Sequence, residues 1–280
     1  MTSTKPGTGL ALARAAHPLP TIAVTCVAVL LAVLAGNSAA ECALLAAAVL
    51  AGQLTVGWSN DLLDAAADAE VGRYSKPLTT RELSPRLVGR CLLAAVPATV
   101  ALSLLAGWRP GLAYLFAVAC GWLYNSWLKG TWFSWLPYAV AFAALPTMAT
   151  LALSPPRWPA GWVVGAASLL GAAANLTNTL PKLAEQHPAR FRGLPDRLGA
   201  RPSLLLAGGL VVLATCWVAG GSSGIPDGLR WTGPVLELLL AGLGSVLLWR
   251  RAETRAPFYA MLAGLMVPAV MLIAAGHRLG

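Results

Sequence analysis

Residues 59–68 read SNDLLDAAAD and close a long apolar stretch of the chain. Three of the 11 acidic residues stand there, at positions 61, 64 and 68, and Glu70 follows two positions later. A buried carboxylate is costly unless a positive charge or hydrogen bonds compensate it. An apolar stretch of this length that ends in carboxylates predicts a membrane helix with a polar site at its end.

The whole chain has the composition of a membrane protein. Hydrophobic residues make up 57% and charged residues 11% of its 280 positions, whereas an average soluble domain carries about 25% charged residues. Nine apolar runs have about the length of a membrane-spanning helix. Their residues do not alternate between apolar and polar, as those of a membrane barrel strand would. The runs cover residues 19–36, 43–62, 87–108, 111–128, 132–153, 161–180, 203–221, 233–249 and 257–275. We therefore predict an all-α polytopic membrane protein of about nine helices.

The basic residues predict how these helices are oriented. With the N-terminus inside, 16 Lys and Arg residues fall in inner segments and four in outer segments, as the positive-inside rule requires. We expect a multi-pass protein of the plasma membrane, surrounded by lipid, with residues 1–18 as a short cytoplasmic tail and residues 1–280 as one domain. The chain has no compact basic domain, so its positive charge does not predict nucleic-acid binding. The five cysteines show no CxxC pair and the three histidines are scattered, so neither group predicts a metal site.

The aspartates predict a metal site themselves. Asp61, Asp64 and Asp68 are three and four residues apart, so they share one face of a helix, with Asn60 at its edge. Adjacent carboxylates repel one another unless a cation lies between them. Mg²⁺ suits oxygen ligands and usually completes its shell with water or substrate phosphate. The face therefore predicts Mg²⁺ and a phosphorylated substrate, and the alternative is a solvated helix end outside the membrane.

Basic residues near this face fit a phosphate site. The segment GRYSKPL, residues 72–78, supplies Arg73 and Lys76 directly after the aspartates. Lys129 lies in LYNSWLKGTWFSWLPY, residues 123–138, where Tyr124 and Asn125 are expected to line the same cavity. Arg and Lys both bind phosphate, Arg through two donors and Lys as a point charge. The alternative for each cation is an anchor at the membrane surface.

A second copy of the acidic segment appears in altered form. The sixth apolar run ends in NTLPKLAEQ, residues 178–186. When Asn178 is laid on Asn60, Lys182 faces Asp64 and Gln186 faces Asp68. Both segments follow runs of the same direction, four helices apart. This predicts two related four-helix units with a ninth helix added.

These segments together resemble the UbiA superfamily of intramembrane prenyltransferases. The resemblance covers most of the chain and implies transfer of an isoprenoid chain from a prenyl diphosphate to a small, commonly aromatic acceptor. It implies that Asn60, Asp64 and Asp68 hold Mg²⁺ against the diphosphate, with support from Asp61. It also implies that Arg73, Lys76 and Lys129 neutralise phosphate charge.

The second motif departs from the family pattern. Family members carry DxxxD there, whereas this chain has Lys182 and Gln186, with Glu185 as the nearest carboxylate. Lys182 can pair directly with the diphosphate beside Asn178, Glu185 can take over metal binding, or selection for ordinary transfer has relaxed. We expect Asp64, Asp68 and Lys182 to act in catalysis. The alternatives are a UbiA-type terpene cyclase, which needs no external acceptor, and a transporter or inactive binding protein.

Overall fold

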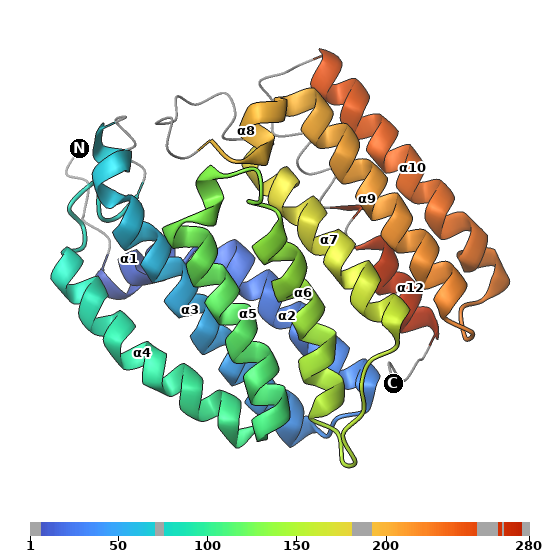
Figure 1. The fold of residues 1–280 in the computed structure, drawn as a ribbon, viewed down its shortest axis with the longest axis horizontal. Helices are drawn as coiled ribbons and strands as arrows, with labels where there is room; N and C mark the ends of the chain where they lie inside the picture. The colour runs from blue at the N-terminus through green and yellow to red at the C-terminus, as the bar shows by residue number, and fades with distance from the viewer. Residues whose placement is uncertain (1–6, 71–75, 181–191, 251–262, 265, 276–280) are drawn as a thin grey trace.

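The computed structural model describes residues 7–70, 76–180, 192–250, 263–264 and 266–275 (Figure 1). The regular structure in these ranges is helical throughout, which confirms the predicted all-α class. The helices are α1 (Thr8–Ala15), α2 (Pro18–Ala35), α3 (Ala39–Glu70), α4 (Pro85–Leu105), α5 (Trp108–Ser126), the short 3₁₀ helix η1 (Leu128–Gly130), α6 (Leu136–Leu151), α7 (Gly161–Thr179), α8 (Leu194–Leu198), α9 (Ala200–Gly221), α10 (Asp227–Arg250) and α12 (Val267–Ala275).

The long helices follow the predicted apolar runs in order. By length and hydropathy, α2, α3, α4 and α9 can each cross a membrane, and α6 is a shorter apolar helix. The ninth predicted run, residues 257–275, lies partly outside the described residues. The count of nine crossings therefore stays a prediction, while the polytopic helical fold is confirmed.

Helix α3 is longer than its apolar run because local signals favour a helix at both ends. At its start, the Ser38 N–H donates to Glu41 Oε2 at 2.7 Å and the Glu41 N–H donates to Ser38 Oγ at 3.3 Å. This reciprocal pair is a capping box. Its last turns contain the alanine run at 65–67, and alanine has the highest helix propensity. The helix therefore continues to Glu70 and carries all three aspartates.

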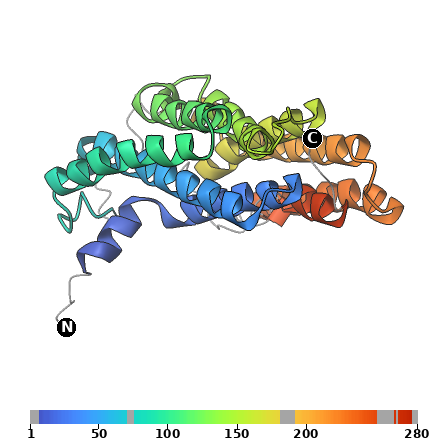
Figure 2. The ribbon, with the colours of Figure 1, turned by 90° about the horizontal axis from the view of Figure 1, so that it is seen from below.

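The helices pack mainly against their neighbours in sequence. In addition, α2 packs against α6, α3 against α5, and α12 against α9. Figure 2 shows α2 and α12 on the opposite side of the bundle from α5 and α6. The main core is rich in alanine, for example Ala28, Ala32 and Ala149, all fully buried. Large apolar side chains such as Leu93 and Trp108 point outward instead, as expected of a surface in contact with lipid.

Close contact between α6 and α7 depends on Gly171. A Cβ atom there would lie 2.4 Å from the backbone oxygen of Tyr138, which cannot move as a flexible side chain can. We expect Gly171→Ala to lower the free energy of unfolding by about 1–3 kcal/mol, measured by thermal unfolding in detergent. Gly209→Ala in α9 is the matched control, because its Cβ would meet nothing within 4 Å. Equal stability of the two variants would contradict this packing.

Helix α1 lies within the predicted tail of residues 1–18 and leads into α2 at the edge of the bundle (Figure 2). Its Ala11 and Ala15 are fully buried against Leu78, Leu83 and Val88, next to the C-terminal half of α3. The tail is thus partly a docked helix, because its small residues allow close approach to the loop before α4.

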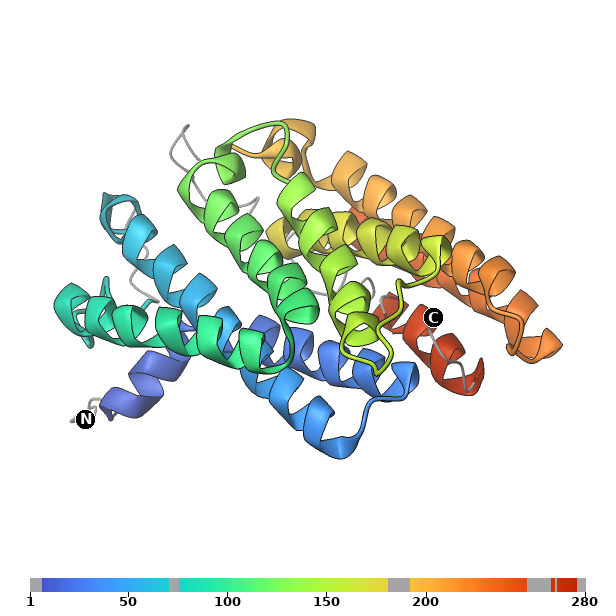
Figure 3. The same cartoon turned by 60° about the horizontal axis from the view of Figure 1, so that its bottom comes forward.

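One end of the bundle collects the polar segments. The loops that contain η1 and α8 lie side by side there (Figures 1 and 3). The Leu194 N–H donates to Ser134 Oγ at 3.0 Å, and Arg197 Nη2 donates to the Gly130 carbonyl at 3.3 Å. These bonds fix the position of η1, which carries Lys129.

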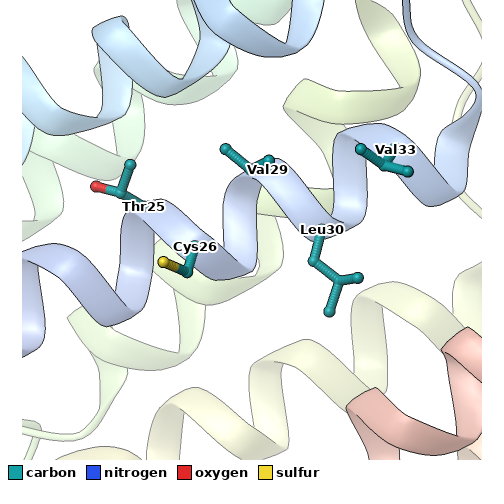
Figure 4. A pocket seen from close by; sticks show the side chains of 5 residues that line it. All are labelled: Thr25, Cys26, Val29, Leu30 and Val33. Atoms are coloured by element: carbon teal, nitrogen blue, oxygen red, sulfur yellow. The ribbon is translucent and has the colours of Figure 1, made fainter. Parts of the chain in front are cut away.

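A shallow groove follows one face of α2 and is almost entirely apolar (Figure 4). It is lined by Thr25, Cys26, Val29, Leu30 and Val33. None of the predicted site residues lines it, so this groove is separate from the acidic end of α3.

Candidate functional site

The three aspartates share one face of α3, as their spacing predicts. Asp61 and Asp68 are buried, with 1% and 4% of their surface exposed. The Asp64 side chain is 16% exposed. Carboxylates this deeply buried must be balanced by nearby charge.

Lys76 supplies much of that balance. Its Nζ atom lies 2.9 Å from Asp61 Oδ1, 2.8 Å from Asp68 Oδ2 and 4.0 Å from Asp64 Oδ2. Burial by itself lowers the pKa of Lys76, but the Asp61 and Asp68 carboxylates outweigh burial and raise it above its ordinary value. The lysine is therefore charged and sits among the three carboxylates.

Lys129 provides a second cation, from another segment of the chain. Its Nζ forms an ion pair with Asp64 Oδ1, and its side chain is 12% exposed. Lys129 comes from η1, which follows α5, whereas Lys76 comes from the loop after α3. Among these five described side chains, the three carboxylates and two ammonium groups sum to one negative charge.

The amides at the edge of the site join α3 to α5. Asn60 Nδ2 donates to Asn125 Oδ1 at 3.2 Å. Asn125 Nδ2 donates to the Val56 carbonyl at 2.8 Å and to Ser59 Oγ at 3.0 Å. Asn125 is therefore a buried link between two helices, and the cavity role that the sequence predicted for it stays a prediction. Asn60 uses its amide nitrogen in this link, so its oxygen is the atom suited to a metal.

An aromatic pair brings α5 and α6 together. The rings of Tyr124 and Tyr138 are 5.1 Å apart with an angle of 78° between their planes, an edge-to-face contact. Asn178, at the end of α7, donates from Nδ2 to the Tyr138 hydroxyl at 3.4 Å. Tyr124 and Asn178 thus both contact Tyr138, which the sequence did not predict as a site residue.

Several predicted site residues cannot be placed. Arg73, Lys182 and Glu185 lie outside the described residues, as does Gln186. Within the described ranges, no three His, Cys, Asp or Glu side chains form a metal-binding group. The aspartates converge on the Lys76 ammonium instead of on one another, because the lysine occupies the centre of their shared face.

His17 belongs to the site although the sequence gave it no role. Its Nε2 lies 3.0 Å from Asp61 Oδ1. His17 lies in the break between α1 and α2, whereas Asp61 lies on α3, so sequence spacing alone could not bring them together. The two prolines after His17, which mark the break before α2, were the available signal of a bend at this point.

Comparisons with known proteins identify the family to which the fold belongs. A model of the UbiA prenyltransferase family matches residues 8–267. The chain matches no curated protein.

Solved structures share the fold at low sequence identity. A UbiA homolog from Aeropyrum pernix K1, in its apo form, is 18% identical with a TM-score of 0.70, covering 94% of this chain and 98% of that one. A UbiA homolog from Archaeoglobus fulgidus, bound to DMAPP and Mg²⁺, is 16% identical with a TM-score of 0.69, covering 94% and 97%. A digeranylgeranylglyceryl phosphate synthase structure is 12% identical with a TM-score of 0.65, covering 95% and 96%.

Proposed function

Because the chain belongs to the UbiA prenyltransferase family, we propose that it is a multi-pass membrane enzyme that transfers an isoprenoid chain from a prenyl diphosphate to a small aromatic acceptor. The observation that carries this proposal is the cluster of three carboxylates and two lysines at one end of the bundle. A similar fold binds DMAPP and Mg²⁺ in the Archaeoglobus fulgidus homolog. We place the site on the cytoplasmic side of the plasma membrane, where most basic residues are expected.

The residues present fit Mg²⁺. All candidate ligands are hard oxygens, which this ion prefers. Asp61 Oδ2 is buried and accepts no hydrogen bond from the described residues, so an acceptor is in place that a cation can satisfy. We assign Asn60, Asp61, Asp64 and Asp68 to the metal, which would stabilise the charge that develops on the leaving diphosphate.

The lysines would act on the diphosphate. Lys76 and Lys129 contact different oxygens of Asp64, so both can turn toward the oxygens of a diphosphate bound beside it. Cations held in place stabilise developing negative charge without reorganising. The C–O bond of the donor breaks, diphosphate departs with its electron pair, and an allylic cation remains. A ring carbon of the acceptor then bonds to that cation and loses a proton.

The aromatic pair would serve the organic half of the reaction. The faces of Tyr124 and Tyr138 attract a cation electrostatically. Asn178, beside the Tyr138 hydroxyl, can bind either the diphosphate or a polar group of the acceptor. Arg73 and Lys182 would add phosphate contacts and Glu185 a metal ligand, as the sequence predicts for these three residues.

A UbiA-type terpene cyclase is the second candidate. One sequence feature favours it: Lys182 and Gln186 stand where the family carries aspartates. A cyclase ionises the same diphosphate, but a double bond within the donor captures the cation. The two functions therefore differ in whether diphosphate leaves without an acceptor.

The test uses the full chain purified in detergent. Prenyl diphosphates of ten, fifteen and twenty carbons are supplied with and without Mg²⁺, and with and without a panel of phenols and aromatic acids. Released diphosphate is measured, organic products are identified by mass spectrometry, and Asp64→Ala is the blank. An alkylated acceptor formed only with Mg²⁺ supports the transferase. A cyclic terpene without acceptor supports the cyclase. No release from any donor would contradict both.

A further inference from the structure

The break between α1 and α2 directs a histidine at Asp61. His17 has φ 53° and ψ 71°, a left-handed conformation that turns the chain between the two helices. The turn brings His17 Nε2 within 3.0 Å of Asp61 Oδ1. A carboxylate can only accept hydrogen bonds, so Nε2 carries the hydrogen and donates it to Asp61.

Helix α1 is fastened to the rest of the protein by specific contacts. Arg14 Nη1 lies 2.7 Å from Glu82 Oε2, in the loop before α4. Trp58 Nε1 donates to the Leu12 carbonyl at 3.0 Å. A Cβ on Gly57 would lie 2.6 Å from the Ala16 carbonyl oxygen, so glycine is needed where α3 meets the break. The position of His17 is therefore fixed independently of its bond to Asp61.

We propose that His17 is a positioning residue for Asp61 and that docking of α1 holds it in place. Oδ1 of Asp61 receives both His17 Nε2 and Lys76 Nζ, at 3.0 Å and 2.9 Å. Two donors to one oxygen restrain the rotation of the carboxylate. The buried Oδ2 accepts no hydrogen bond from the residues that the structure describes, and its direction is set by the bonds to Oδ1.

This inference rests on the proposed function because it assigns Oδ2 to the Mg²⁺ of that site. Groups that orient a metal ligand typically contribute about 10–100-fold to metal affinity. His17 supplies this support to Asp61 from the break after α1, before the first predicted membrane span. The N-terminal segment is thus part of the active site.

The test measures metal binding without turnover. Mn²⁺ replaces Mg²⁺ so that free and bound ion can be counted by electron paramagnetic resonance. Geranyl thiodiphosphate, which resists cleavage, fills the diphosphate site. We expect His17→Ala to weaken Mn²⁺ binding about 10-fold and His17→Gln to restore most of the affinity, because the glutamine amide can donate to Asp61. Alanine and glutamine share the cost of the left-handed conformation, so their difference reports the side chain.

Arg109→Ala is the control. Arg109 is exposed in the first turn of α5 and lies over the Trp108 ring, and it takes no part in the docking of α1, so we expect less than about a 3-fold change in affinity. Thermal unfolding confirms that every variant is folded. Equal Mn²⁺ affinity in wild type, His17→Ala and His17→Gln would overturn the proposal, as would an equal loss in both His17 variants. Wild-type Mn²⁺ binding without prenyl transfer to any acceptor would instead contradict the proposed function and leave this inference standing.

Discussion

Asp68→Asn is expected to lower Mg²⁺-dependent diphosphate release at least about 100-fold. The substitution keeps the shape of the side chain and removes one negative charge from the face that α3 presents. Asp68 is 4% exposed and lies 2.8 Å from Lys76 Nζ, so bulk solvent cannot replace the lost charge. Even groups that only orient a metal ligand contribute about 10–100-fold, and a ligand itself should contribute more. The measurement is initial rate against Mg²⁺ concentration with a fixed donor.

The control for Asp68→Asn is Asp227→Asn. The Asp227 side chain is 97% exposed in the first turn of α10, so the same chemical change there should leave the rate unaltered. High Mg²⁺ should partly restore Asp68→Asn, because weakened affinity can be offset by mass action. A loss of less than about 5-fold, in a variant that unfolds at the wild-type temperature, would remove Asp68 from the metal site.

The acidic face could be predicted because it depends only on helix geometry. Intervals of three and four residues place Asp61, Asp64 and Asp68 together in any helix, and α3 bears this out. The predicted apolar run stopped at residue 62, whereas the helix continues to Glu70. Hydropathy marks what contacts lipid, but helix propensity and capping decide where the backbone remains helical.

The partners of the face could not be predicted in full. Lys76 and Lys129 were identified as phosphate ligands from their charge, yet the structure pairs them directly with the aspartates. His17 was set aside as a scattered histidine. Its bond to Asp61 requires α1 to dock through Ala11, Ala15 and Gly57, and such contacts between distant segments leave no periodic signal in the sequence.

The sequence also could not predict which helix Asn125 contacts. Tyr124 and Asn125 are adjacent in the sequence and were both expected to line a cavity. On a helix, adjacent residues face different directions. Asn125 points at α3 and bonds to Val56 and Ser59, whereas Tyr124 packs on Tyr138 of α6. A motif identifies which residues matter without assigning the face of the helix on which each one acts.

Lys76→Met is expected to destabilise the protein and to make it depend on Mg²⁺. The variant leaves buried Asp61 and Asp68 without the ammonium group that lies between them. Removal of one partner from a buried ion pair costs about 3–5 kcal/mol, which corresponds to a fall of roughly 10 °C in Tm for a chain of this size. Mg²⁺ should raise the Tm of Lys76→Met more than that of wild type, since the ion can replace the missing charge. Thermal unfolding in detergent, with and without Mg²⁺, measures both effects.

Arg86→Met separates the local effect from general loss of positive charge. Arg86 is exposed in the first turn of α4, where a cation opposes the helix dipole, so its removal should not lower Tm. If Lys76→Met unfolds at the wild-type temperature, the two close ion pairs contribute nothing to stability. If Lys76→Met has a lower Tm but Mg²⁺ raises the Tm of this variant and of wild type equally, the carboxylates around Lys76 are not the ones that bind the metal. If the same carboxylates of α3 bind both Lys76 and Mg²⁺, the Tm of Lys76→Met must fall in the absence of Mg²⁺ and recover when Mg²⁺ is added.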